Sequence, residues 1–466
     1  MFHELKKFFF ILFLFLSATV QAKQKNIIFM LSDDQSWSGL SVQMDPDDKN
    51  SISLYDETPN LATLAAEGAR FTKAYAPSPV CSPSRISIQT GKTPARLGWT
   101  KAAPFLNAKT GQYLIPPQHD KNISQSDITI GEMLKTADYK TAHFGKWHLL
   151  GGGPQSHGYD LSDGDTGNKY AAEFSDPNPV DLFGMIKRAE NFIDKSQNEN
   201  KPFYIQLSFH ALHYPENALN DTIQKYSQKY SESLKKIEIE RLALNENMDA
   251  AIGRLLNYLE AKNIAKDTFI IFMADNGAFR RFSSLKGGKG TLWEGGIRVP
   301  FIMKGPGIPK NSINHSPIVG YDLFPTFMNI AGIKSYPTYL DGANIIDTFD
   351  PGYNPSSRPN GGLIFHFPHY QKKQKPASAI IIDNIKLIKH YGQESDMLFD
   401  LSVDISEQDN LVVKKPELYR SLLTKLEGYL QSVNASIPVL NSNFDPGLIN
   451  ELEKKKKTKK KTRKKK

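Results

Sequence analysis

The stretch NIIFMLSDDQ, residues 26–35, carries the pattern that decides the fold. Five apolar residues run without a break from Ile27 to Leu31 and stop at a serine and two adjacent acids. A short apolar run with polar bounds is typical of a strand that is buried on both faces of a sheet. Three later stretches repeat the pattern: KTAHF (140–144), FYIQLSF (203–209) and TFIIFMA (268–274).

Helical patterns separate these strands. One of them, PNLATLAAEGA, places Leu61 and Leu64 on one face and is expected to end near Gly68. Further helices are expected from Ser126 and across residues 221–262. Strands that alternate with helices predict an α/β sheet with helices on both of its faces.

The character of the chain changes after about residue 345. A turn-rich stretch, DTFDPGYNPSSRPNGG, leads into four short strand patterns, LIFHF, ASAIIID, IKLIKHY and DMLFDL, and then into a helical pattern that begins at Pro416. Short strands joined by turns predict a small antiparallel sheet packed against one helix. We therefore expect a first domain over residues 23–345 and a C-terminal subdomain over residues 346–450.

Residues 1–22 have the features of a cleaved secretory signal. Two lysines precede an apolar run over residues 8–16, and Val20 and Ala22 stand where a signal peptidase cuts. The run is short for a bilayer span, and an uncleaved anchor is the alternative. No later stretch is apolar enough to span, so we expect a periplasmic or secreted protein without stable membrane insertion.

The net charge of +9 is misleading, because residues 454–466 alone hold eleven basic residues and no acid. Without that tail the chain is slightly acidic. A block of like charges is disordered by composition, so residues 451–466 are expected to form a mobile appendage. A near-neutral body without a basic motif, on an exported chain, argues against nucleic acid as a partner.

Cys81 is the only cysteine in the chain, and it stands in the stretch PVCSPSRIS, residues 79–87. A lone cysteine cannot form a disulfide within its own chain and is most often a buried, inert residue. Pro83 and the residues after it, however, predict a helix that starts just after Cys81 and ends near Gly91. Because a helix N-terminus lowers the pKa of a thiol, we interpret Cys81 as a nucleophile or the precursor of one.

Polar and reactive residues follow each of the four strand patterns. They are Asp33 and Asp34, Lys146 and His148, His210 and His213, and Asp275 and Asn276. If the strands are parallel, these residues meet at one edge of the sheet, where α/β folds bind their ligands. Three carboxylates and an amide carbonyl form an all-oxygen set suited to Ca²⁺ or Mg²⁺.

The motifs CSPSR and TGKTPARLG together resemble the signature of the type I, formylglycine-dependent sulfatases of the alkaline phosphatase superfamily. SDDQ, GKWHL, LHYP, ADNG and GGKGTLWEGGIRVP match other motifs of that family, in the family's order. The resemblance covers roughly residues 25–430. It implies an alkaline-phosphatase-like α/β fold, in which a large mixed sheet lies between helices and a small antiparallel sheet with a helix follows at the C-terminus.

The resemblance also implies the chemistry of the site. In this family a formylglycine-generating enzyme, or an anaerobic sulfatase-maturating enzyme, oxidises the matching cysteine to formylglycine (3-oxoalanine), whose hydrated aldehyde is the nucleophile. The residues that match the family's catalytic positions are Cys81, Arg85, Lys146, His148, His213 and Lys289. Those that match its ligands for one Ca²⁺ are Asp33, Asp34, Cys81, Asp275 and Asn276.

The same resemblance gives roles to the groups that move protons. His213 with Lys289 assists the leaving oxygen as general acid, and His148 takes a proton during release of sulfate. Glu294 and Arg298 in the motif WEGGIRVP are interpreted instead as a structural pair.

A sulfated poly- or oligosaccharide is the expected substrate, because an exported chain that resembles this family suggests polysaccharide breakdown in the periplasm or outside the cell. We expect an algal type such as ulvan or carrageenan in preference to a glycosaminoglycan. The Gly- and Asp-rich segment over residues 151–170 is expected at the rim of the site. Four side chains are candidate sugar or sulfate contacts, with surface or interdomain roles as the alternative: Arg280, Arg281, His366 and His369.

Two other functions fit the same residues. A phosphonate or phosphate monoester hydrolase of the same superfamily could use the same metal frame. A non-catalytic protein that binds sulfated glycans through its basic tail would instead carry an unmodified Cys81.

Overall fold

The computed structural model describes residues 24–102, 111–118, 122–279, 282–337, 339–371 and 374–445. The expected signal (1–22) and basic tail (451–466) lie outside these residues, as do Arg280 and Arg281. Within the described ranges, no helix is both long enough and apolar enough to cross a bilayer.

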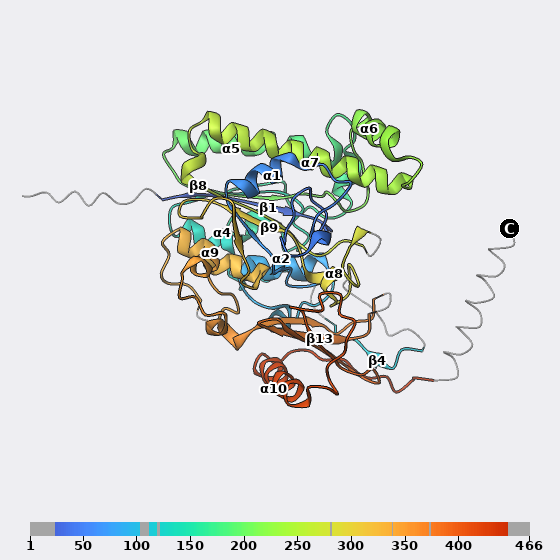
Figure 1. The fold of residues 1–466 in the computed structure, drawn as a ribbon. Coiled ribbons are helices and arrows are strands. Elements are labelled where there is room, and N and C mark those ends of the chain that lie inside the picture. Colours follow the sequence, from blue (N-terminus) through green and yellow to red (C-terminus); the bar gives the residue numbers. More distant parts are fainter. Residues whose placement is uncertain are drawn as a thin grey trace, which may run out of the picture.

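A mixed sheet forms the centre of the molecule (Figure 1). Among the described residues it has eight strands, in the order β10 (Ser312–Asn314), β2 (Ala69–Phe71), β9 (Phe301–Lys304), β8 (Thr268–Ala274), β1 (Asn26–Ser32), β7 (Phe203–Ser208), β5 (Lys140–Gly145) and β6 (Leu161–Ser162). β8, β1, β7 and β5 are parallel neighbours, whereas β9 runs antiparallel to β8. All four strand predictions are confirmed, with ends that differ by at most one residue.

Helices cover both faces of this sheet, as predicted. One face packs against α1 (Pro59–Ala66), α5 (Leu182–Asn198) and α7 (Lys236–Ala261), the layer at the top of Figure 1. The other face packs against α2 (Cys81–Thr90), α4 (Ile130–Lys135) and α9 (Leu323–Ile330). Alternate residues of β1 supply the two cores, because successive side chains of a strand point to opposite faces. Ile28 and Met30 join the first core, and Phe29 joins the second.

The helical stretch predicted over residues 221–262 is two helices. A turn over residues 231–234 separates α6 (Asn220–Tyr230) from α7. The shorter elements are α3 (Pro94–Leu97), α8 (Glu294–Ile297), the strand pair β3 (Ala74–Tyr75) with β11 (Ile318–Val319), and the strand pair β4 (Leu114–Ile115) with β16 (Val439–Leu440).

The C-terminal part forms the predicted antiparallel sheet and helix. The strands β12 (Leu363–Phe367), β13 (Ala377–Ile382), β14 (Ile385–His390) and β15 (Met397–Asp400) pair in sequence order. Helix α10 (Pro416–Ser432) packs on one face of this sheet through Leu422 and Leu426. The other face packs against the first domain, where Phe365 meets Tyr75. Figure 1 shows this sheet below the layer that contains α2. The division of the chain into two domains at residue 345 stays a prediction.

Candidate active site

The carboxyl ends of the parallel strands bring the predicted acids together. Asp33 and Asp34 follow β1. Asp275 and Asn276 follow β8, which pairs in parallel with β1. Ligand atoms of the three acids and of Cys81 lie within 4.8 Å of one another, and all four side chains are buried. The predicted convergence of these strand ends is confirmed.

Cys81 enters this cluster from the start of α2. The helix begins at Cys81 and ends at Gly91, whose φ of 68° lies in the left-handed region that glycine favours. The Sγ atom donates to Oδ1 of Asp33 at 3.4 Å and accepts from Nζ of Lys289 at 3.3 Å. The cysteine therefore lies against both an acid and a cation.

The predicted activation of the thiol is wrong. Burial, with Asp275 and Asp33 beside it, raises the pKa of Cys81 to about 12. These contributions outweigh the helix N-terminus, because a low-polarity site and two carboxylates both disfavour a thiolate. An unmodified Cys81 is a poor nucleophile here, which favours the other interpretation, a precursor residue.

Arg85 ties α2 to the ends of two strands. It lies one helical turn after Cys81, and its Nε donates to Oδ2 of Asp275 at 2.9 Å. Its Nη1 donates to the carbonyl oxygen of Lys146 at 2.7 Å. The guanidinium is buried, so these charge-assisted hydrogen bonds hold the cysteine-bearing turn against the acids.

Two lysines bring positive charge to the same place. Nζ of Lys146 contacts Asp33, and Nζ of Lys289 lies 2.5 Å from Oδ1 of Asp34. Burial alone would raise the pKa of Asp33, but Lys146 and the neighbouring cations hold it well below its usual value. Burial would likewise lower the pKa of Lys289, but Asp34 holds it well above its usual value. The site thus combines three carboxylates with three cationic side chains.

The oxygen atoms of this cluster fit a hard cation. Oδ2 of Asp34 and Oδ1 of Asn276 are buried without a hydrogen-bond partner, although Nδ2 of Asn276 donates to the other oxygen of Asp34 at 2.7 Å. Unpaired buried oxygens carry a free-energy cost that a bound cation would remove. Carboxylate and amide oxygens are the ligands that Ca²⁺ prefers, so the residues fit the metal that the resemblance implies.

Both predicted catalytic histidines lie at this edge of the sheet. Burial, with Lys146 nearby, lowers the pKa of His148 to about 2, so its ring is neutral. Nδ1 of His213 donates to the carbonyl oxygen of Tyr214 at 2.8 Å, which leaves Nε2 as the other nitrogen of the ring. The N–H of Leu212, the residue before His213, donates to the carbonyl oxygen of Asp33 at 2.7 Å, which places this turn beside the acids.

The segment over residues 151–170, predicted at the rim, contacts the backbone of the site. The carbonyl oxygen of Thr166 accepts from the N–H of His148 at 2.8 Å, and its hydroxyl accepts from the N–H of Trp147 at 3.0 Å. Tyr170 stacks on His210 with ring centroids 5.5 Å apart. The segment therefore supports the turns that follow β5 and β7.

Arg241 is a residue that sequence reasoning missed. It comes from α7 and is buried. Its guanidinium donates to the carbonyl oxygen of Asp34 at 2.8 Å and to that of Leu212 at 3.0 Å, so it joins the turn after β1 to the turn after β7. An arginine within a long helix gives no signal of this role, because charged residues of helices usually face water.

Two of the candidate substrate contacts are buried in the C-terminal part. The ring nitrogens of His366 contact the hydroxyl of Ser378 at 2.6 Å and the carbonyl oxygen of Ser436 at 3.1 Å. The ring of His369 contacts the hydroxyl of Thr100 at 2.7 Å. Both histidines are at most 2% exposed, which favours a packing role over contact with a substrate.

Fold and site together define a class of enzyme. A mixed sheet between two helix layers carries, beyond its parallel strands, a cluster of buried oxygen atoms suited to a cation, a cysteine at a helix start and three cationic side chains. This arrangement is suited to binding a tetrahedral anionic ester and to stabilising charge on its oxygens. The class is that of hydrolases acting on esters of tetrahedral oxyanions.

The chain belongs to the sulfatase family. The family model described as Sulfatase matches residues 25–333, and the model described as N-sulphoglucosamine sulphohydrolase, C-terminal, matches residues 288–436. The protein is therefore a sulfuric ester hydrolase, and the resemblance drawn from its motifs is confirmed.

Known sulfatases are similar to it over much of its length. A sulfatase of Formosa agariphila is 30% identical and covers 91% of this chain and 92% of its own. An ulvan-active sulfatase of the same organism is 28% identical, and the match covers 88% of this chain and 81% of that protein. The N-acetylgalactosamine-6-sulfatase of Rattus norvegicus is 29% identical over 70% of this chain and 66% of its own. The crystal structure of Ps i-CgsB in complex with k-i-k-neocarrahexaose has a TM-score of 0.73 at 24% identity, over 87% of this chain and 93% of that chain, and shares the alkaline-phosphatase-like fold.

Proposed function

We propose that this sulfatase hydrolyses sulfate esters of poly- or oligosaccharides, with formylglycine formed from Cys81 as its nucleophile and one Ca²⁺ as its metal. The observation that carries the proposal is the position of Cys81. The sole cysteine lies at the start of α2, among three buried carboxylates and 3.3 Å from Nζ of Lys289. A thiol with a raised pKa is a poor nucleophile in this position, whereas an oxygen nucleophile formed from the same residue suits it.

Four side chains would hold the cation: Asp33, Asp34, Asp275 and Asn276. Bound there, Ca²⁺ would supply Lewis acidity, and the modified residue 81 would supply a hydroxyl oxygen as nucleophile. Arg85 keeps residue 81 against the acids through its contacts with Asp275 and with the backbone of Lys146.

The remaining residues bind the ester and hold protons. Lys146 and Lys289 already lie beside the acids, and their ammonium groups would offset the charge on the sulfuryl oxygens. His213 would hold the proton destined for the leaving oxygen, and the neutral ring of His148 would accept one as sulfate leaves. Each proton transfer of this kind is typically worth ~10²–10⁴ in rate.

A sulfated algal polysaccharide, such as ulvan or carrageenan, is the proposed substrate class in preference to a glycosaminoglycan. The ulvan-active relative is matched over 88% of this chain, and the N-acetylgalactosamine-6-sulfatase over 70% at nearly the same identity. Release of sulfate from ulvan and carrageenan oligosaccharides, compared with chondroitin sulfate oligosaccharides, separates the two classes. Faster release from chondroitin sulfate would overturn this part of the proposal.

Export to the periplasm or the cell exterior belongs to the same proposal, since large polysaccharides are met there. Its support is the pattern of residues 1–22, with small residues at Val20 and Ala22. N-terminal sequencing of the protein recovered from its native compartment should begin at Lys23. Recovery of an intact N-terminus in the cytoplasm would contradict export.

Mass spectrometry tests the nucleophile. Peptides that span residues 79–87, taken from active protein made together with a maturation enzyme, should carry an aldehyde or its hydrate at position 81. Cys81→Ala should abolish sulfate release with little change in the circular dichroism spectrum. A fully active sample that contains only the free thiol would refute the assignment.

The phosphonate and phosphate monoester hydrolases of the same superfamily provide the matched comparison. One preparation should release 4-nitrophenol faster from the sulfate monoester than from the phosphate monoester. The reverse order would assign the site to phosphoryl or phosphonyl esters instead.

A further inference from the structure

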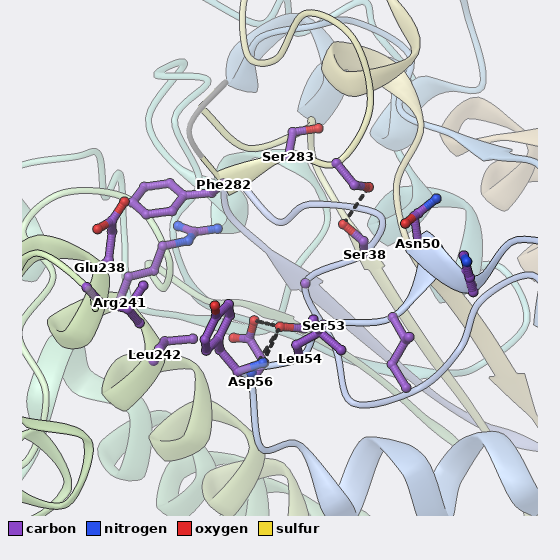
Figure 2. Close-up of a pocket in the computed structure, with 16 residues that line it drawn as sticks. Ser38, Asn50, Ser53, Leu54, Asp56, Glu238, Arg241, Leu242, Phe282 and Ser283 are labelled. Atoms are coloured by element: carbon purple, nitrogen blue, oxygen red, sulfur yellow. Dashed lines mark hydrogen bonds between the residues drawn. The ribbon is translucent and has the colours of Figure 1, made fainter. Parts of the chain in front are cut away.

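A cavity of about 660 Å³ lies next to the active site and contains none of the residues assigned above to catalysis or to the cation. Its walls come from three separate parts of the chain: residues 38–56, residues 234–242 around the start of α7, and residues 282–284. Figure 2 shows Phe282 and Arg241 on one side of the opening, with Asn50 on the other. The volume is in the range of small-molecule binding sites.

The cavity shares its walls with the segments that form the cation site. Ser38 lies in the turn that continues from the two acids after β1, and the segment of Ser284 continues from Asp275 and Asn276 after β8. The hydroxyl of Ser284 donates to the hydroxyl of Ser38 at 2.8 Å, so the two segments are in direct contact.

Arg241 contacts both the cavity and the backbone of the active site. On one side its guanidinium donates to the carbonyl oxygen of Asp34 at 2.8 Å. On the other side it lies 4.5 Å from the centroid of the Phe282 ring, which lines the cavity (Figure 2). A ligand in the cavity would therefore be one side chain away from the backbone of the cation site.

The lining combines apolar surfaces with neutral hydrogen-bonding groups. Tyr55 and Phe282 offer aromatic surface to C–H groups of a ligand. The amide of Asn50 can donate and accept hydrogen bonds, and the hydroxyls of Ser38, Ser283 and Ser284, which already bond within the protein, can accept further ones. A sugar ring presents this same pair of surfaces, an apolar face of C–H groups and a rim of hydroxyls.

The charges of the lining argue against a sulfated ligand. They are two of each sign: Lys49, Arg241, Asp56 and Glu238. The guanidinium of Arg241 is already bound to backbone carbonyls, and the carboxyl of Asp56 accepts from Ser53 at 2.7 Å. A balanced set of charges gives an anion no preference for this cavity over water.

We propose that this cavity binds an unsulfated sugar residue of the same carbohydrate chain whose sulfated residue occupies the active site. The inference rests on the proposed function. A sulfated monosaccharide would fill only the active site, whereas an oligosaccharide would fill the cavity as well. The cavity would thus make the enzyme favour longer substrates.

The test compares two substrates that share one sulfated residue: the sulfated monosaccharide and a tetrasaccharide in which the other three residues are unsulfated. The measured quantity is the ratio of kcat/KM for the tetrasaccharide to kcat/KM for the monosaccharide. Phe282→Ala should lower this ratio about threefold to tenfold, the effect of losing one aromatic contact. Asn50→Ala is the second variant, because Asn50 is exposed and lies away from Arg241.

Tyr339→Ala is the matched control, since Tyr339 is a half-exposed aromatic residue outside the cavity and should leave the ratio unchanged. The inference is overturned if the wild-type ratio is close to one, or if the cavity variants leave it unchanged. Failure of the proposed function is a different result, because neither substrate would then release sulfate.

Discussion

Lys386 offers the sharpest test of how the two parts of the chain are held together. The side chain lies on β14 and is wholly buried, and its Nζ is 2.9 Å from Glu294 and 2.8 Å from Glu407. Glu294 in turn lies 3.3 Å from Arg298, the structural pair predicted from the sequence, and accepts from the hydroxyl of Tyr75 at 3.1 Å. Buried charges thus hold the C-terminal sheet against the segment that carries Lys289.

Lys386→Met keeps the length of the side chain and removes its charge. Glu294 and Glu407 would then share a buried space, with Arg298 beside Glu294 and Lys286 beside Glu407 as the nearby cations. Removal of one partner from a buried ion pair typically costs ~3–5 kcal/mol, a large part of the ~5–15 kcal/mol that stabilises a typical domain. We therefore expect a loss of about 3 kcal/mol or more in the free energy of unfolding.

The loss should depend on pH with a definite sign. Burial already raises the pKa of Glu407 to about 7, and removal of Lys386 raises it further. A carboxyl group whose pKa is raised in the folded state takes up a proton there that it lacks when unfolded, so stability falls as pH rises through that range. The variant should therefore lose less stability at pH 6 than at pH 8.

Urea unfolding, followed by fluorescence at both pH values, measures the effect. The control is Lys389→Met on the same strand, because Lys389 pairs with Glu427 at 2.6 Å in a partly exposed position. Exposed pairs contribute ~0–1 kcal/mol, so this variant should unfold near the wild-type urea concentration. Equal losses in the two variants, or a larger loss at pH 6, would refute the reasoning.

Three further predictions concern the metal, the stability of the protein at acidic pH, and the basic tail. Asp275→Ala should remove both the bound Ca²⁺, measured by elemental analysis, and the turnover of a sulfate ester. Asp47→Ala, a substitution of an exposed acid, should keep both. Full metal occupancy in Asp275→Ala would contradict the proposed ligand set. Burial lowers the pKa of His366 from 6.5 to about 4. The free energy of unfolding should therefore fall as pH drops from 6.5 to 4, by up to about 1.4 kcal/mol per pH unit. In His366→Gln, urea unfolding should show a weaker dependence of stability on pH over this range. Deletion of residues 454–466 should leave turnover of a small sulfate ester unchanged and raise the apparent KM for a long sulfated polymer at low salt alone; a lower kcat on the small ester would place the tail in the folded site.

The strands and the acids of the site could be predicted together, because the position where an apolar run ends marks both the end of the strand and the start of its polar residues. Each apolar run stops where its polar residues begin, so the end of β8 at Ala274 also places Asp275 at the edge of the sheet. The helices between the strands then favour parallel pairing, and parallel pairing brings the edges together. No tertiary contact had to be known for Asp33 and Asp275 to be expected side by side.

Buried charges could not be predicted in the same way. Arg241 stands in a long helix, and Lys386 in the alternating strand pattern IKLIKHY, where charged residues usually face water. Partners from distant segments bury them: the backbone of Asp34 for the arginine, and Glu294 for the lysine. Periodicity reports which face of an element is apolar, and it carries no information on such partners.

The pKa of the Cys81 thiol could not be predicted for the same reason, because it depends on residues from distant segments. The sequence identifies the helix start and predicts a lowered pKa, and the helix start is where it was expected. Burial and the charges of Asp33 and Asp275 have the opposite effect and are larger. A helix terminus contributes typically 0.3–1 kcal/mol, which is small beside the cost of burying an anion next to two others.

The segment of Lys289 links the C-terminal part of the chain to the acidic cluster, although the four side chains proposed to hold the cation all come from the first part of the chain. The N–H of Lys289 donates to the carbonyl oxygen of Ala278 at 2.8 Å, and further along the same segment the N–H of Glu294 donates to Glu407 at 2.8 Å. The first hydrogen bond lies beside the acidic cluster, and the second reaches the C-terminal part of the chain. These contacts hold Nζ of Lys289 3.3 Å from Sγ of Cys81. Electrostatic stabilisation of a transition state needs charges that are placed in advance, so the role proposed for Lys289 depends on this segment. The acidic cluster depends on the strand ends of the first part of the chain, whereas the position of this positive charge depends on both parts of the chain.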